Sequence, residues 1–218
     1  MTLTTIPGVI RTIARPLRKP RGQDRPLLAK RVVDLVLAPA VLMALLPVLL
    51  LIALLIRLES RGPVLYRQPR NGRDRQVFMI LKFRTMHVGI EDGRQAQRGD
   101  HRVTRVGRFL RRTSLDELPQ LVNVLRGEMS LVGPRPHPLW LDERFGSEIP
   151  GYACRFAVPP GITGLAQING CRGETPDVAT MARRVEWDSR YVERCSPMLD
   201  LKILALTLAV IWTDRRAY

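Results

Sequence analysis

An uninterrupted apolar segment near the N-terminus constrains this chain more than any other feature. Residues 35–56 form a run of 22 residues without a charged side chain, built mostly from Leu, Val, Ile and Ala. As a straight helix this run would extend about 33 Å, close to the ~30 Å hydrocarbon core of a bilayer. A cleaved signal peptide fits less well, because the run begins late and is longer than a normal signal core. The sequence therefore predicts a membrane helix.

Basic residues flank this helix on both sides: eight precede it, and eight more lie between Arg57 and Arg84. Because positively charged flanks stay on the cytoplasmic side, this distribution favours placing both ends of the helix there. Pro47 lies inside the run, where it removes a helical hydrogen bond and favours a kink. We therefore expect a re-entrant helix hairpin that turns at Pro47, although a helix spanning the bilayer fits these residues equally well. At its entrance Lys30, Arg31 and Asp34 are expected among lipid headgroups.

The charge of the chain is concentrated in its first half. Residues 1–112 hold 23 basic and 7 acidic side chains, whereas residues 113–218 hold 12 and 13. This imbalance indicates an anionic partner. A membrane-anchored nucleic-acid-binding protein is one candidate, but it needs aromatic stacking platforms and only 6% of the chain is aromatic. Three cysteines without metal-type spacing argue against a disulfide scaffold or a structural zinc site and suit a reducing compartment.

The rest of the chain predicts a small folded domain of the α+β class. Alternating apolar residues on either side of Asn71-Gly72 predict a short β-hairpin. Helical spacing predicts helices over residues 105–112, 115–125 and 181–192, with a break at Arg126-Gly127. Residues 198–212 are too short and polar to span a bilayer and predict an interfacial or packed helix. The predicted architecture is a re-entrant membrane helix hairpin plus a small mixed helical domain with a short β-hairpin and interfacial amphipathic helices.

Three segments follow from this division. Residues 1–29 are expected to form a flexible basic arm on an anionic membrane surface, residues 30–58 the re-entrant membrane helix, and residues 59–218 a cytoplasmic catalytic domain. Within that domain, residues 89–101 lack periodicity and predict a loop that can order over a substrate.

The densest group of chemically useful residues is RRTSLDELPQL at 111–121, where two adjacent carboxylates follow two adjacent arginines. Ser114 and Glu117 have capping-box spacing, which predicts that Asp116 and Glu117 lie in the first turn of a helix. The helix dipole and the arginines should then keep Asp116 ionised. Such a carboxylate can hold a divalent metal or attack phosphorus. From spacing alone, an ordinary negatively charged helix start is the simpler interpretation.

Basic residues elsewhere can complete a phosphate clamp around these carboxylates. Lys82 and Arg84 can share one face of the predicted strand, and Arg135 is held between two prolines. Rigid arginines of this kind suit a diphosphate. The glycine-rich segment 160–175 permits close approach to a ligand, although it is neither a Walker A loop nor a dinucleotide fingerprint.

Four ordered motifs resemble those of the bacterial sugar transferase family, the monotopic polyprenyl-phosphate phosphoglycosyl transferases. They are KFRTM at 82–86, RRTSLDELPQLVNVLRGEMSLVGPRP at 111–136, PPGITGLAQINGCRGE at 159–174 and DSRYVERCSPMLDLKIL at 188–204. The resemblance runs from about Lys30 to the C-terminus.

This resemblance implies a covalent mechanism centred on Asp116. Its carboxylate would attack the β-phosphate of a nucleotide-diphosphate sugar and release the nucleoside monophosphate, with Glu117 as its dyad partner. Polyprenyl phosphate would then take the phosphosugar from the enzyme in a ping-pong cycle that uses Mg²⁺, for which Asp116 is the expected protein ligand. The basic residues assigned to phosphate binding are Lys82, Arg84, Arg111, Arg112, Arg135 and Arg172.

The resemblance also implies a membrane arrangement and a set of partners. Pro47 aligns with the break in the family's re-entrant helix, although Leu46 stands where relatives often carry serine. The expected partners are a UDP-sugar, undecaprenyl phosphate and membrane lipid, without nucleic acid, and homo-oligomer formation stays open. The motif around Arg172 resembles glucose 1-phosphate transferases, so UDP-glucose is preferred over UDP-galactose. The expected location is the cytoplasmic face of a bacterial inner membrane, and the expected reaction is the first step of exopolysaccharide repeat-unit assembly. A noncatalytic scaffold of polysaccharide assembly is the alternative.

Overall fold

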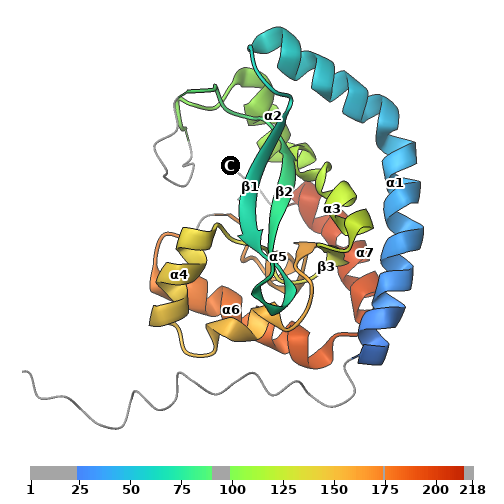
Figure 1. Cartoon of the computed structure of the whole chain (residues 1–218), viewed down its shortest axis with the longest axis vertical. Helices are drawn as coiled ribbons and strands as arrows, with labels where there is room; N and C mark the ends of the chain where they lie inside the picture. The colour runs from blue at the N-terminus through green and yellow to red at the C-terminus, as the bar shows by residue number, and fades with distance from the viewer. Residues whose placement is uncertain (1–23, 90–98, 174, 214–218) are drawn as a thin grey trace, which may run out of the picture.

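The computed structural model describes residues 24–89, 99–173 and 175–213 and has a mixed helical and sheet architecture (Figure 1). The first 23 residues of the expected basic arm and residues 90–98 of the expected loop lie outside the described residues. The longer elements are α1 (Asp24–Glu59), β1 (Leu65–Asn71), β2 (Val77–Phe83), α2 (Arg105–Thr113), α3 (Gln120–Arg126), β3 (Ser130–Val132), α4 (Leu139–Glu148), β4 (Gly161–Thr163), α5 (Leu165–Ile168), α6 (Val178–Arg194) and α7 (Pro197–Thr213). Short 3-10 turns η2 (Arg73–Arg75), η3 (Leu115–Glu117) and η4 (Tyr152–Phe156) connect them.

The apolar segment forms a single helix, α1, which is long and apolar enough to cross a membrane and which contains Pro39 and Pro47. The helix bends, so that its first part follows one side of the molecule and its last part crosses above α2 (Figure 1). Ala38 is buried against the core shared with α3, β3 and α7, and Ile52 and Ile56 are buried in a separate cluster with residues of β2 and α2. Both ends of α1 therefore pack against the same body of protein.

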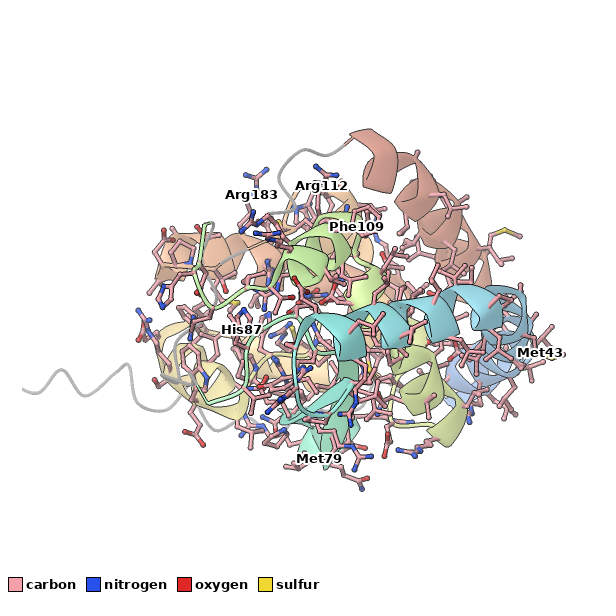
Figure 2. All side chains as sticks on the ribbon, turned by 90° about the horizontal axis from the view of Figure 1, so that it is seen from above. Met43, Met79, His87, Phe109, Arg112 and Arg183 are labelled. Carbon is pink, nitrogen blue, oxygen red and sulfur yellow. The ribbon has the colours of Figure 1, made fainter. Side chains whose placement is uncertain are left out.

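Between these two contact regions α1 is largely uncovered, although Leu42 still packs against the first core and Leu49 against the second cluster. No residue from Pro39 to Leu51 is buried, and the apolar side chains there are extensively exposed. Met43 projects from the end of the molecule with 76% of its surface exposed (Figure 2). Because soluble proteins rarely leave so large a contiguous apolar surface in water, this stretch is suited to lipid.

Lys30 is buried beneath the helix rather than placed among headgroups, so that expectation was wrong. Its ammonium donates to Asp200 Oδ2 at 2.6 Å, to the Tyr191 hydroxyl at 3.0 Å and to the Val132 carbonyl at 2.5 Å. Tyr191 in turn donates to the other oxygen of Asp200 at 2.7 Å. A buried charge is costly unless it is paired and hydrogen-bonded, and here Lys30 meets that requirement. We refer to Lys30, Tyr191 and Asp200 as the Lys30 anchor.

Asp34 and Arg31 extend this attachment of α1. Asp34 is buried and accepts hydrogen bonds from Ser130 Oγ at 3.0 Å and Leu131 N at 2.9 Å, at the start of β3. Arg31 donates to the Val124 and Leu125 carbonyls in the last turn of α3, where the carbonyls of a helix lack their regular partners. The charged residues at the start of α1 thus attach the helix to the rest of the protein.

The predicted hairpin is confirmed as the antiparallel pair β1–β2, in which Leu65 lies opposite Phe83 and Asn71 opposite Val77. Its connection is longer than the Asn71-Gly72 signal suggested, because the turn η2 is inserted before the chain returns. Asn123 of α3 ties the hairpin to the helices: its side chain accepts from Leu81 N at 3.0 Å and donates to Met79 O at 2.8 Å.

A second pairing, the parallel contact of β3 with β4, was not predicted from the sequence. The chain segments approach closely at Gly161 of β4 and at Gly133, directly after β3. A Cβ on Gly161 would lie 2.0 Å from Gly133 N, and one on Gly133 would lie 2.4 Å from Pro159 O. These glycines therefore serve backbone packing. Gly161 belongs to the segment 160–175, in which the sequence suggested room for a ligand.

Candidate active site

The two adjacent carboxylates lie in η3, a short turn between α2 and α3. Ser114 ends α2 in the left-handed region at φ 57°, which turns the chain sharply before Asp116 and Glu117. The predicted capping box is wrong, because the Ser114 side chain caps neither helix and its hydroxyl instead accepts from Arg172 Nη2 at 2.7 Å. The carboxylates therefore precede α3, which begins only at Gln120, rather than occupying its first turn.

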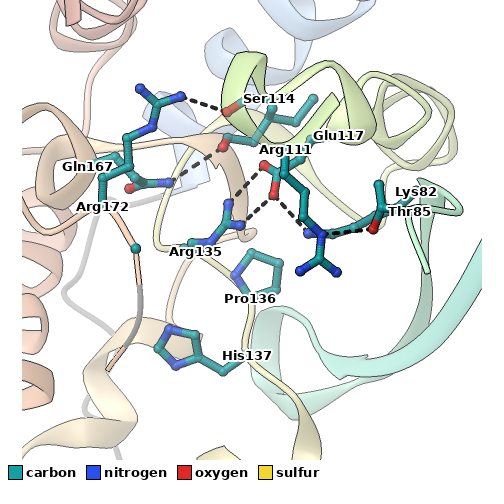
Figure 3. A network of polar contacts seen from close by, with 12 residues as sticks. Lys82, Thr85, Arg111, Ser114, Glu117, Arg135, Pro136, His137, Gln167 and Arg172 are labelled. Carbon is teal, nitrogen blue, oxygen red and sulfur yellow. Dashed lines mark hydrogen bonds and ion pairs between the residues drawn. The ribbon is translucent and has the colours of Figure 1, made fainter. Parts of the chain in front are cut away.

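Glu117 is buried and held by two cations from different parts of the chain (Figure 3). Lys82, from β2, donates to Oε1 at 2.8 Å. Arg135, from the loop after β3, donates to both oxygens of Glu117, to Oε2 at 2.9 Å. Burial raises the pKa of Glu117, but Arg135 and Lys82 outweigh it and leave the pKa well below its usual range. Glu117 is therefore a fixed negative charge that orients Lys82 and Arg135.

Asp116 has a different environment from its neighbour. Among the described residues, no side chain or backbone group forms a hydrogen bond or ion pair with its carboxylate. Burial and the adjacent charge of Glu117 raise the pKa of Asp116 to about 6, against the lowering influence of Lys82 and Arg111. Asp116 is expected from the sequence to be ionised, and with this pKa its carboxylate is mostly ionised at neutral pH, although the cations do not outweigh burial and Glu117. A partly desolvated, ionised carboxylate of this kind is a competent nucleophile.

Arg111 and Arg172 are two further cations held near the dyad. Arg111, in the last turn of α2, donates from Nε to Thr85 Oγ1 at 2.8 Å (Figure 3). Arg172 reaches the same region through its bond to Ser114, two residues before Asp116. Together with Lys82 and Arg135, these arginines provide charge-assisted donors suited to a diphosphate.

The remaining two predicted phosphate-binding residues lie elsewhere. The structure directs Arg84 to the end of α1, where its guanidinium donates to the Ser60 and Arg61 carbonyls at 2.8 and 2.6 Å. Arg112 is exposed and points outward from α2 (Figure 2). Neither side chain is brought to the carboxylates.

Two hydroxyl contacts at the site were not predicted from the sequence: Thr85 was not singled out, and Ser114 was assigned to a helix cap. Both lie inside motifs that the resemblance used, yet a hydroxyl carries no charge pattern or spacing by which its role can be read. Only the fold identifies them as the groups that hold Arg111 and Arg172.

The donor set at the dyad fits a magnesium ion that is bound largely by substrate. No group of three or more His, Cys, Asp or Glu side chains that could hold a metal ion occurs in the part of the chain that the structure describes. The oxygens of Glu117 are engaged by Lys82 and Arg135, which leaves the carboxylate of Asp116. Mg²⁺ is commonly held by one or two carboxylates together with waters and substrate phosphates, so a single protein carboxylate is compatible with it.

Comparison with known proteins places these residues in a family. Residues 25–214 match the family described as bacterial sugar transferase. The UDP-glucose:undecaprenyl-phosphate glucose-1-phosphate transferase of Caulobacter vibrioides is 53% identical over 194 residues, which cover 88% of this chain and 72% of the relative. The protein of the same name from Escherichia coli is 50% identical, over 88% of this chain and 42% of its own length.

A third relative, the undecaprenyl-phosphate glucose phosphotransferase of Komagataeibacter xylinus, is 50% identical over 90% of this chain and 39% of its own length. The chain thus spans most of one relative and about two fifths of the other two. In all three the matched part includes most of this chain, and the family match contains the dyad and its cations. The chain belongs to the bacterial sugar transferase family.

Proposed function

We propose that this protein transfers a sugar 1-phosphate from a UDP-sugar to a polyprenyl phosphate through a covalent intermediate on Asp116, as the first step of exopolysaccharide repeat-unit assembly. One observation carries the proposal: a partly desolvated carboxylate without a hydrogen-bond partner in the described structure lies beside a carboxylate that organises two cations. The resemblance assigns the nucleophile to the first of these two positions, and the geometry supports that assignment.

In the first step, an oxygen of Asp116 would attack the β-phosphorus of the UDP-sugar. The bond from that phosphorus to the oxygen bridging it to the α-phosphate breaks, and UMP leaves with the bond's electrons. Arg135 and Lys82, held in place by Glu117, would neutralise the negative charge that develops on the transferring phosphoryl group. Arg111 and Arg172 would bind the remaining phosphate oxygens.

In the second step, an oxygen of polyprenyl phosphate would attack the same phosphorus. The bond to Asp116 breaks, the carboxylate is regenerated, and a polyprenyl-diphosphate sugar is formed. Each step exchanges one phosphorus–oxygen bond for another, so neither needs an oxidant or a reductant.

We also propose a requirement for Mg²⁺, which Asp116 and the donor diphosphate would hold. Bound there, the ion would supply charge neutralisation to the phosphates. Chelation with EDTA is expected to stop UMP release, and added Mg²⁺ to restore it; full activity in the chelator would contradict this part of the proposal.

For the membrane arrangement, we propose that α1 is re-entrant and that the domain lies on the cytoplasmic face of a bacterial inner membrane. The contacts of both ends of α1 with one body of protein support this, since that body cannot occupy both sides of a bilayer. The unburied stretch from Pro39 to Leu51 is about 20 Å long as a helix, shorter than the ~30 Å hydrocarbon core. The exposed apolar residues of α7, among them Leu206 and Leu208, fit an interfacial helix.

We infer that the donor sugar is glucose, because the three relatives described above carry glucose in their names. A direct test is UMP release from a panel of UDP-sugars by the purified protein in lipid with polyprenyl phosphate. UDP-glucose is expected to give the highest kcat/KM. Preference for UDP-galactose would change the donor while keeping the reaction class, and absence of UMP release from every donor would favour the noncatalytic scaffold.

A further inference from the structure

A second group of buried polar side chains lies behind the dyad and takes no part in the proposed chemistry. It consists of His137, Arg155, Arg184 and Asp188, each at most 4% exposed, and we refer to it as the His137 cluster. Arg184 and Asp188 are one turn apart on α6, and Asp188 Oδ2 lies 3.0 Å from Arg155 Nη2. Burying charges of this kind costs free energy because they lose their contact with water, so a structural or functional role is expected for them.

The two arginines of the cluster hold the backbone of the loops that carry the site arginines. Arg155 Nη2 donates to the carbonyl of Arg135 at 2.7 Å. Arg184 Nη2 donates to the carbonyls of the residues before and after Arg172, at 2.8 and 2.9 Å. Arg155 thus fixes the loop that carries Arg135, and Arg184 fixes the loop that carries Arg172.

His137 connects these two guanidinium groups. Its Nδ1 lies 2.5 Å from Arg155 Nη1, and its Nε2 lies 3.0 Å from Arg184 Nη1. Arginine can only donate, and the neutral ring has one acceptor nitrogen. With the proton on Nδ1, that nitrogen donates to the Tyr152 hydroxyl at 3.0 Å, which itself accepts from Arg155 Nη1 at 2.8 Å, while Nε2 accepts from Arg184. Burial and the charges of Arg155 and Arg184 hold the pKa of His137 well below its usual range, which keeps the ring neutral. The ring therefore separates two cations at a fixed distance.

We infer that His137 is a positioning residue for the nucleotide-sugar donor: by joining Arg155 to Arg184 it sets the spacing between Arg135 and Arg172, the two arginines that would grip the diphosphate. This inference rests on the proposed function. His137 lies beyond Pro136 as seen from Glu117, so its ring does not contact the reacting groups (Figure 3). It acts on the donor only through the two loops.

Kinetics with separate donor and acceptor titrations test the inference. His137→Phe keeps a ring but removes both nitrogens, and it is expected to lower kcat/KM for UDP-glucose about tenfold to a hundredfold, since small misplacements of binding groups have effects of this size. The KM for UDP-glucose should rise while the KM for polyprenyl phosphate stays unchanged. His137→Gln, whose amide can accept from one arginine, should recover part of the loss. The matched control is His87→Gln, at an exposed position, with wild-type kinetics expected.

A double-mutant cycle separates positioning from a purely structural role. In an Arg135→Lys background the two-pronged guanidinium of Arg135 is already gone. There His137→Phe should lower kcat/KM for UDP-glucose by less than about threefold, because the effects of residues that act through one contact are not additive. The same factor in both backgrounds, or an equal rise in the KM of both substrates, would overturn the inference while leaving the reaction intact. If His137→Phe does not fold, His137→Gln carries the same cycle. Absence of UMP release by the wild-type protein would overturn the proposed function and this inference together.

Discussion

The Lys30 anchor and the dyad site both bury carboxylates next to cations, but they satisfy them differently. In the anchor, Lys30 and Tyr191 each donate to one oxygen of Asp200. At the dyad, Glu117 is satisfied in the same way by Lys82 and Arg135, whereas Asp116 beside it has no such bond among the described residues. Charged groups that are fully hydrogen-bonded to one another hold helices and strands together. A carboxylate without such bonds, as Asp116 is here, is available for chemistry. The contrast predicts that changes at the two places separate stability from activity.

The largest expected effect is on turnover, from changes to the dyad. Asp116→Asn removes the nucleophile and should lower kcat by at least about a thousandfold, the scale seen when a covalent catalyst is deleted. Glu117→Gln loosens Lys82 and Arg135 and should cost about a hundredfold or more. Steady-state UMP release measures both. Circular dichroism should report an unchanged fold, and Asp74→Asn, in the hairpin connection, is the matched control; near-normal turnover by Asp116→Asn would contradict the assignment.

Next in size is the effect of opening the Lys30 anchor. Lys30→Met leaves Asp200 buried without its cation and should lower the free energy of unfolding by about 3–5 kcal/mol. Urea unfolding in detergent micelles measures this, with Lys202→Met at an exposed position of α7 as the control. The folded fraction should keep the wild-type kcat. A fall in kcat without loss of stability would show that the two clusters are not separable in this way.

The pH dependence of the first step gives a smaller and graded effect. Because burial and Glu117 raise the pKa of Asp116 to about 6, its reactive carboxylate form predominates above that pH and is lost below it. The rate of adduct formation should therefore fall about tenfold for each pH unit below 6. The pKa of Glu117 is held well below its usual range, so it stays ionised across this window. Single-turnover kinetics between pH 5 and 8 measure the profile, and a flat profile through pH 6 would refute the raised pKa.

The smallest effect is expected where the structure places a predicted phosphate-binding residue on the surface. Arg112 is exposed and points outward from α2, so Arg112→Ala should change kcat/KM for the donor by no more than about twofold. The variant to compare it with is Arg172→Ala, which removes a cation bonded to Ser114 and should lower kcat/KM for the donor far more. Equal losses in the two variants would place Arg112 at the donor after all.

Local patterns in the sequence predicted the parts of the fold that depend on neighbours in the chain. The β1–β2 hairpin and the helices α2, α6 and α7 follow from alternation, from helical spacing and from turn residues. The three-residue strands β3 and β4 were missed because they pair across about thirty residues and are too short to show a period. Helix α4, which begins directly after Pro138, was missed as well.

The candidate site likewise divides into features that the sequence predicts and features that depend on contacts between distant residues. Asp116, Glu117 and their cations could be identified because four motifs resemble a family, but spacing gave the wrong role to Ser114 and the wrong surroundings to Lys30. Charge alone does not reveal whether a lysine faces lipid or a buried aspartate. Arg84 lies in the motif of Lys82 and yet binds the end of α1. Contacts between residues so distant in the chain exist only once the fold brings them together.

The central claim is that Asp116 forms a bond to phosphorus, and intact-protein mass spectrometry tests it most directly. Protein incubated with UDP-glucose and Mg²⁺ without the lipid acceptor should gain the mass of one hexose phosphate, lose it when polyprenyl phosphate is added, and gain nothing as the Asp116→Asn variant. Peptide mapping should place the added mass on the 115–117 turn. An adduct of the same yield in Asp116→Asn, or one mapped to another residue, would contradict the account.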